Sequence, residues 1–98
     1  MGFFDQMKQL SEIKQKMEDV KKRLDTITVE AENDWVKVTA NGNRKITGVN
    51  ILKADDAQQL EVSLVSALNQ VLEKSDNVMQ SEMMGATKGM LPNVPGLG

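Results

Sequence analysis

Residues 36–42, Val-Lys-Val-Thr-Ala-Asn-Gly, constrain the fold of this chain more than any other segment. The alternation of apolar and polar residues is typical of a β-strand, and Asn41-Gly42 is typical of a two-residue type I′ hairpin turn. A segment with a heptad pattern precedes this hairpin, and a longer segment with an apolar stripe follows it. We therefore expect an α+β protein of two layers, in which a hairpin lies between two long helices.

The first helix is expected over residues 3–24, because apolar residues recur there at alternating spacings of three and four. This narrow seam consists of Leu10, Ile13, Met17, Val20 and Leu24. With the first of these at heptad position a, every e and g position between residues 14 and 23 is cationic: Lys14, Lys16, Lys21 and Arg23. In a homodimeric coiled coil these like charges would face one another, which disfavours a simple self-pairing of this helix.

Residues 27–51 predict three antiparallel strands, of which the second covers residues 35–40 and the third about residues 43–51. A two-residue turn would pair Ala40 with Asn43, Val38 with Lys45 and Val36 with Thr47. The expected core face then carries Val36, Val38, Ala40, Thr47, Val49 and Ile51. On the other face Trp35 would lie over Gly48 beside Ile46, and the glycine also predicts a local bend.

The second helix is expected to begin after Asp56, which has the spacing of a capping box with Gln59. A broad apolar stripe follows, and Gly85 is the expected stop. The remainder is rich in Gly and Pro. We therefore expect one domain over residues 1–84 and a flexible tail over residues 85–98.

The composition argues against several classes of function. The chain has no His, Cys or Tyr, which removes the commonest general base, the most nucleophilic side chain and a frequent acid. No residue spacing indicates a metal or cofactor site, and no small-molecule substrate is expected. No run approaches the roughly 18 apolar residues of a membrane span, and the chain does not start like a signal peptide. We expect a cytoplasmic protein without enzymatic activity.

The basic residues of the first helix are the candidate functional site: Lys8, Lys14, Lys16, Lys21, Lys22 and Arg23. Residues 1–24 hold these six cations against four carboxylates, whereas residues 55–84 hold six carboxylates against one lysine. Two interpretations stay open, namely a solvated face with ion pairs to the acidic second helix, or contact with phosphate groups. No aromatic residue stands among these cations to stack unpaired bases, so phosphate contact would favour duplex DNA.

A chain of 98 residues is too small to bury every apolar face in this pattern, so we expect self-association. The candidate residues for a homodimer interface are Trp35, Ile46, Leu10, Ile13 and Met17. A soft apolar patch near the end of the second helix is either a packed helix end or a surface for a partner protein. It consists of Met79, Met83, Met84 and Met90.

Three segments are informative together: Met7-Lys8-Gln9, the hairpin at residues 36–42 with residues 46–51 after it, and the tail at residues 89–96, which begins Gly-Met-Leu-Pro. With these segments the chain resembles the YbaB/EbfC family of small bacterial nucleoid-associated proteins. The resemblance covers nearly the whole chain in the same order. The hairpin with its flanking helices is its most specific part.

The resemblance implies a homodimer of protomers with α-β-β-β-α order, whose helical arms project from a body centred on a three-stranded antiparallel sheet. It also implies binding of duplex DNA and a role in nucleoid organisation or gene regulation. Only Lys8 lies within a matching motif, so the other cations rest on the heptad argument. The alternative is a dimeric protein-interaction module, an adaptor or chaperone-like protein, that does not bind DNA.

Overall fold

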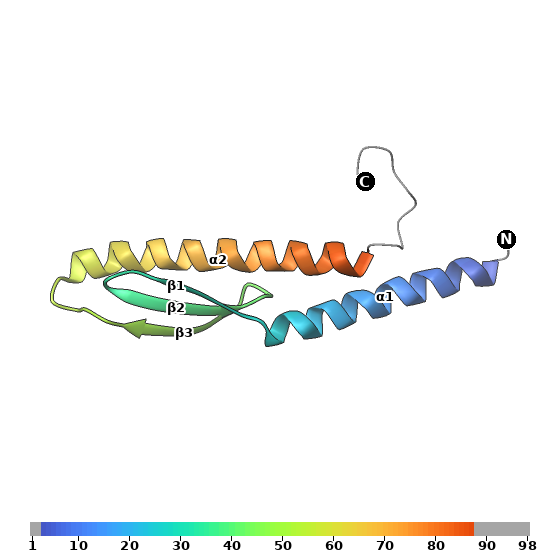
Figure 1. Cartoon of the computed structure of the whole chain (residues 1–98), viewed down its shortest axis with the longest axis horizontal. Coiled ribbons are helices and arrows are strands. Elements are labelled where there is room, and N and C mark those ends of the chain that lie inside the picture. The colour runs from blue at the N-terminus through green and yellow to red at the C-terminus, as the bar shows by residue number, and fades with distance from the viewer. Residues whose placement is uncertain (1–2, 88–98) are drawn as a thin grey trace, which may run out of the picture.

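The computed structural model describes residues 3–87, and the side chains of residues 7–86. The elements follow in the order α1 (Phe3–Thr26), β1 (Thr28–Glu32), β2 (Val36–Asn41), β3 (Ile46–Ile51) and α2 (Ala57–Thr87) (Figure 1). The strands form one antiparallel sheet in the order β1-β2-β3. The predicted α+β fold with α-β-β-β-α order is confirmed.

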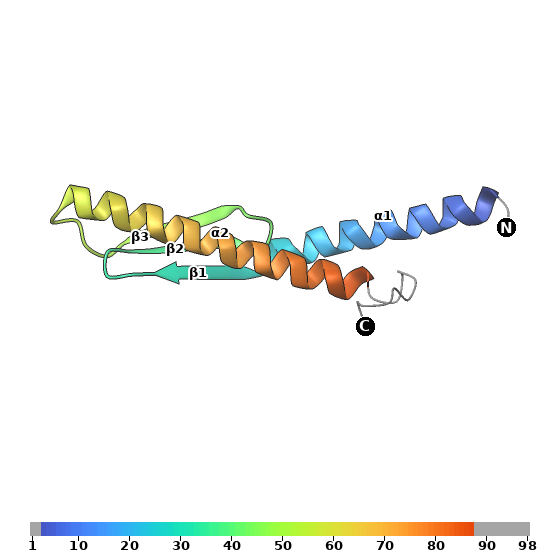
Figure 2. The same cartoon turned by 90° about the horizontal axis from the view of Figure 1, so that it is seen from above.

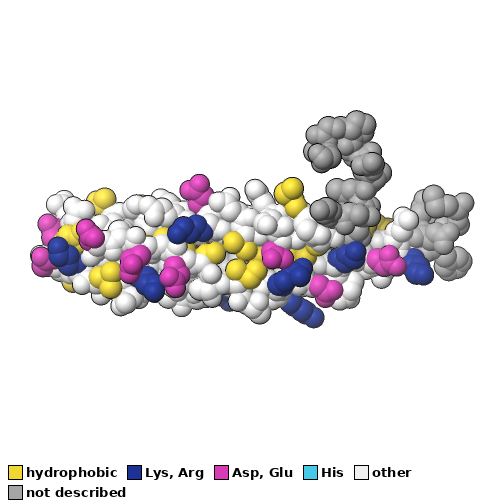
Figure 3. Space-filling view, viewed as in Figure 1, with side chains coloured by type: hydrophobic (Ala, Val, Ile, Leu, Met, Phe, Trp, Pro, Cys, Tyr) yellow, Lys and Arg dark blue, Asp and Glu magenta, His cyan; other side chains and the backbone are white. Residues whose placement is uncertain are grey.

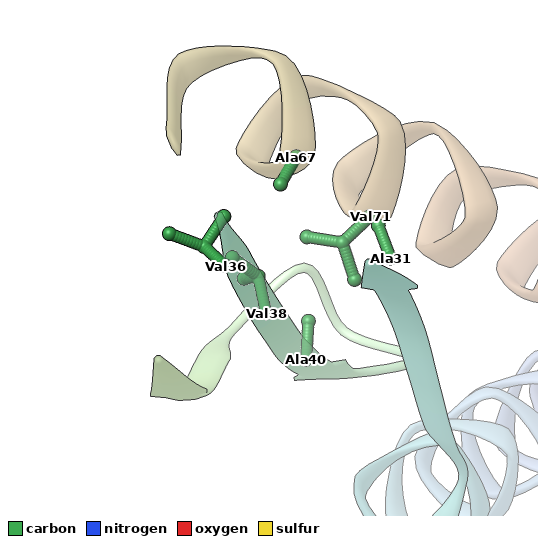
Figure 4. Close-up of a cluster of buried hydrophobic side chains, with 6 residues drawn as sticks. All are labelled: Ala31, Val36, Val38, Ala40, Ala67 and Val71. Carbon is green, nitrogen blue, oxygen red and sulfur yellow. The ribbon is translucent and has the colours of Figure 1, made fainter. Parts of the chain in front are cut away.

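The two helices have different relations to the sheet. α2 lies across one face of the sheet, whereas α1 leaves one end of the sheet and projects beyond the last turn of α2 (Figures 1 and 2). The structure is accordingly elongated, with principal extents of 67 × 28 × 16 Å. The core lies between α2 and the sheet and consists of Ala31, Val36, Val38, Ala40, Ala67 and Val71 (Figure 4).

The predicted core face is only partly covered. Val36, Val38 and Ala40 of β2 are fully buried, as the alternating pattern predicts. Val49 and Ile51 of β3 lie opposite two of these residues and share their face, yet they are 48% and 54% exposed. The reason is that α2 packs across β1 and β2. β3 is therefore an edge strand whose apolar side chains are not covered by α2.

The turn between β2 and β3 differs from the predicted two-residue type I′ turn. Asn41 N–H donates to the Lys45 carbonyl at 2.9 Å, and Arg44 N–H donates to the Asn41 carbonyl at 3.3 Å, so residues 42–44 form the loop. The positive φ, 65°, falls on Arg44, while Gly42 lies outside the left-handed region. A turn followed by one left-handed residue is a common form of three-residue hairpin.

Gly42 is required by a close approach to α1 and not by its own φ. A Cβ atom at this position would lie 2.8 Å from Leu24 Cδ2 and 3.0 Å from Leu24 O. Gly42 N–H donates to the carbonyl oxygens of Leu24 and Ile27, at 2.9 and 3.1 Å. The Asn-Gly pair therefore marks a contact with the end of α1, which a local turn signal does not reveal.

The longer loop changes the register of the hairpin. Val38 lies opposite Val49 and not opposite Lys45, and the other two predicted pairs are also wrong. Because this shift is an even number of residues, the faces of the strands stay as predicted beyond the bulge. The bulge lies between Thr39 and Ala40 and leaves Thr47 out of the register. This irregularity falls next to Gly48, where the sequence predicts a bend.

The same shift moves Trp35 away from its predicted contact with Gly48. Leu52 N–H donates to the Trp35 carbonyl at 2.7 Å, so the two residues lie opposite each other at the far end of the hairpin. The half-buried Trp35 ring packs against the core, and Lys53 Nζ lies 5.0 Å from its centroid. Ile46 begins β3 beside the turn. Trp35 and Ile46 therefore do not form the predicted cluster.

The ends of α2 are set by different kinds of signal. Asp56 Oδ1 accepts a hydrogen bond from Gln59 N–H at 3.1 Å, which confirms the predicted N-cap. The reciprocal half of the capping box is replaced, because Gln59 Nε2 donates to Ser63 Oγ at 3.4 Å. α2 continues through the predicted stop at Gly85 to Thr87. The rest of the predicted tail, residues 88–98, lies outside the described residues.

We predict that Gly42→Ala lowers the free energy of unfolding by about 1–3 kcal/mol, because the new methyl group would overlap the Leu24 side chain and carbonyl. Urea unfolding followed by far-UV circular dichroism measures the change. Gly85→Ala is the matched control, since a Cβ at that position has no described atom within 4 Å. Equal stability of the Gly42→Ala variant and the unmodified protein would refute the proposed role of this contact.

Candidate nucleic-acid interface

The six predicted basic residues all carry exposed side chains on α1: Lys8, Lys14, Lys16, Lys21, Lys22 and Arg23. At about 1.5 Å per helical residue they extend over about 22 Å of the helix axis. In the face that Figure 3 shows, Lys and Arg side chains follow α1 with Asp and Glu side chains between them. The helix thus presents a row of cations along a projecting rod, interrupted by its own carboxylates.

The acidic second helix reaches one of these cations. Arg23 Nε lies 2.9 Å from Glu82 Oε2, and both side chains are partly exposed. For the five lysines, the side chains described between residues 7 and 86 provide no carboxylate within ion-pair distance. Neutralisation by α2, one of the two interpretations of the sequence, thus holds for Arg23 alone among the described contacts.

The loop between β2 and β3 fixes the end of α1. Asn43 Nδ2 donates to the Lys21 carbonyl at 2.9 Å and to Asp25 Oδ1 at 2.6 Å. The N–H group of Gly42 donates to the Leu24 carbonyl in the same turn of the helix. The Leu24 carbonyl lies in the last turn of α1, where carbonyls lack intrahelical donors, so the Gly42 bond satisfies the helix end and, with the Asn43 bonds, orients α1. The direction of the basic rod therefore depends on this loop.

The same loop is anchored to α2. Ser75 Oγ donates to the buried Asn41 carbonyl at 2.8 Å and accepts from Arg44 N–H at 2.9 Å. The Arg44 guanidinium also pairs with Asp76, with Nη1 2.6 Å from Oδ1. Sequence reasoning missed Asn43, Ser75 and Asp76. A signal exists for Ser75, because it is a polar residue one helical turn after Val71, in line with the buried stripe of α2.

A pocket of about 180 Å³ lies between the helices, next to this loop. Its lining is mainly apolar and includes Met17, Val20 and Leu24 of α1 with Met79 and Met83 of α2. Two of the predicted methionines therefore line the contact between the helices. Met84 is exposed, and Met90 lies outside the described residues.

The candidate dimer residues lie in separate places. Leu10 and Ile13 are 66% and 42% exposed on α1, and Met17 is half-buried where α2 begins to cover the seam. Trp35 and Ile46 lie at opposite ends of β2. The structure therefore does not bring these five residues onto one surface.

A different apolar surface was missed by sequence reasoning. Lys74 Nζ donates to the Glu30 carbonyl at 2.6 Å, which turns that flank of α2 toward β1. The opposite flank carries Val65, Leu68 and Leu72 and so lies on the side of β3, where Val49 and Ile51 are exposed. We call these five residues the β3–α2 edge. An alternating pattern identifies such residues as apolar but does not show which element covers them.

Within the described part of the chain, no helix is long and apolar enough to cross a membrane. Among the same residues, no group of three or more acidic side chains is placed to hold a metal ion.

A small sheet with one covering helix and one projecting basic helix defines a class of α+β proteins that present cations on an arm. The YbaB/EbfC DNA-binding family matches residues 1–90 of this chain. The chain belongs to that family, and the resemblance seen in its sequence is confirmed.

Relatives from several bacteria are similar along nearly their whole length. A nucleoid-associated protein of Flavobacterium johnsoniae is 36% identical over 101 residues, which cover 99% of this chain and 95% of the relative. One of Rhodopseudomonas palustris is 37% identical over 103 residues, covering 98% and 95%. One of Chlorobium phaeobacteroides is 35% identical over 91 residues, covering 89% and 82%.

We predict that Ser75→Ala lowers the free energy of unfolding by about 1–3 kcal/mol, because the buried Asn41 carbonyl and the Arg44 N–H each lose their hydrogen bond to the Ser75 hydroxyl. Chemical unfolding at fixed protein concentration measures this. The control is Ser81→Ala at an exposed position of the same helix, with an expected change within about 0.5 kcal/mol. If both substitutions had the same effect, the loop would not depend on this hydroxyl.

Proposed function

We propose that this protein binds duplex DNA as a homodimer, mainly through contacts between the α1 lysines and the phosphate backbone, and acts in nucleoid organisation or gene regulation. The carrying observation is that five exposed lysines of α1 have no carboxylate partner among the described side chains. Membership of a DNA-binding family and the nucleoid-associated relatives support the same reading.

The chemistry of the arm favours backbone contact over base recognition. Lysine is a point charge on a flexible stem, suited to phosphate oxygens but not to bidentate recognition of base edges. Within α1 no aromatic residue stands between Lys8 and Arg23 to stack on unpaired bases. We therefore propose a weak sequence preference. The names of the relatives support a location in the nucleoid, which we also propose.

In this proposal, dimerisation raises the affinity of the lysines for duplex DNA. The chain has a formal net charge of −2, so one arm is a weak ligand for a polyanion. Two arms double the number of cations that one duplex meets. If the dimer neutralises about six phosphates, the logarithm of affinity falls with the logarithm of salt concentration at a slope of about −5.

We propose the β3–α2 edge as the centre of the dimer interface. Val49, Ile51 and Val65 are large apolar residues about half exposed, and β3 is an edge strand of the sheet. Contiguous exposed apolar surface of this kind is typical of interaction sites. The α1 seam is a poorer candidate because its cationic flanks would face each other across a two-fold axis.

We expect Lys14→Glu combined with Lys21→Glu to abolish the salt-sensitive mobility shift of duplex DNA at about 50 mM salt, because phosphate contacts dominate such binding. The matched control reverses the same amount of charge away from the arm, with Lys45→Glu and Lys53→Glu, and should bind nearly as well as the parent. Unchanged binding by the arm variant would favour the alternative, a protein-interaction module without DNA binding.

Ile51→Asp should convert the dimer to a monomer, because it places a carboxylate at the centre of the proposed interface. Sedimentation equilibrium at micromolar concentration measures the molar mass. Asn50→Asp introduces the same charge on the neighbouring residue of β3, on the opposite face of the sheet, and should stay dimeric. A dimeric Ile51→Asp variant would show that the interface lies elsewhere.

A further inference from the structure

The apolar seam of α1 is buried at one end and exposed at the other. Val20 and Leu24 are 3% and 2% exposed, because they pack against α2. Met7, Leu10 and Ile13 continue the same face of the helix and are 53%, 66% and 42% exposed. We call these three residues the open seam. It is the direct extension of a surface that the protein itself covers elsewhere.

The open seam begins where α2 ends. The last turn of α2, at Gly85 and Ala86, lines a cleft with Lys16, Asp19 and Arg23 of α1. α1 then projects beyond this last turn in both views (Figures 1 and 2). The described end of α2 therefore lies close to the start of the open seam.

We propose that residues 88–98 lie along the open seam of the same protomer. From residue 17 to residue 7 the seam spans about 15 Å of helix axis. Eleven extended residues reach up to about 36 Å, so the segment is long enough to cover the seam even with a turn at its start. This proposal concerns the tail and does not depend on DNA binding.

The composition of the segment fits this surface. Its apolar residues are Met90, Leu91, Val94 and Leu97, and Lys88 is its one ionisable side chain. Pro92 and Pro95 disfavour a regular helix, and an extended segment suits the proposed contact with a neighbouring surface. A segment with a single lysine can lie between the lysines that flank the seam without bringing a second row of cations.

Competing occupants are less favourable. The α1 helix of a second copy would bring its own lysines against Lys14 and Lys16, at a Coulomb cost that is smaller for a segment with one lysine. A tethered segment also acts at a millimolar effective concentration, well above that of a separate protein at micromolar levels.

The chain has no cysteine, so Asn93→Cys provides a single attachment site for a nitroxide label in the full-length protein. We expect the label to weaken the amide NMR signals of residues 7–17 beyond those of residues 28–51. The control variant adds Leu91→Ser and Val94→Ser to the labelled protein, and should lose this selective effect. Equal signal loss in both labelled proteins, or none in either, would overturn the proposal.

A mixed sample identifies which protomer supplies the segment. Protein that carries ¹⁵N but no nitroxide is mixed with protein that carries the nitroxide but no ¹⁵N. Only contacts between copies then weaken the detected signals. We expect residues 7–17 to keep their intensity in this sample. Loss of intensity there would assign the seam to the tail of a second copy and would overturn the intramolecular contact.

Discussion

The hydrogen bonds made by the loop between β2 and β3 are the constraint on which the arrangement of this protein depends. Gly42 N–H and the Asn43 side chain hold the last turn of α1, while Ser75 holds the loop against α2. Among the described residues, the other packing of α1 is mainly against α2 and not against the sheet. A short polar loop thus sets the direction in which the cationic arm points.

The element order was predictable because its signals are local. The seam of α1, the alternation in β2 and the cap at Asp56 each lie within a few residues of the structure that they specify. The register was not predictable from the same signals. Asn41-Gly42 satisfies a type I′ turn as a local sequence, whereas the structure uses its glycine for contact with Leu24, far away in the chain. Glycine is needed at this position for a tertiary contact and not for the conformation of the turn.

The candidate site was also predictable only in part. Heptad positions place the lysines on exposed flanks of α1, and the structure finds their side chains exposed. Which cation meets a carboxylate depends on how α1 crosses α2, so the Arg23–Glu82 pair could not be read from the spacing. The exposure of Val49 and Ile51 could not be predicted from the sequence either. Their pattern is that of buried residues, but a pattern does not show which surface covers them.

The length of the α1 projection explains how an acidic protein can hold a polyanion in the proposed complex. α2 ends opposite residues 16–23 of α1, and Lys8 lies about 12 Å further along the axis. That distance exceeds the Debye length of about 8 Å at physiological salt, so the carboxylates of α2 are largely screened at the tip of the arm. The arm also carries Glu12, Glu18 and Asp19, which leave only a small excess of positive charge. Two such arms on one duplex, held by a shared interface, are therefore a physical requirement of the proposed binding and not an addition to it.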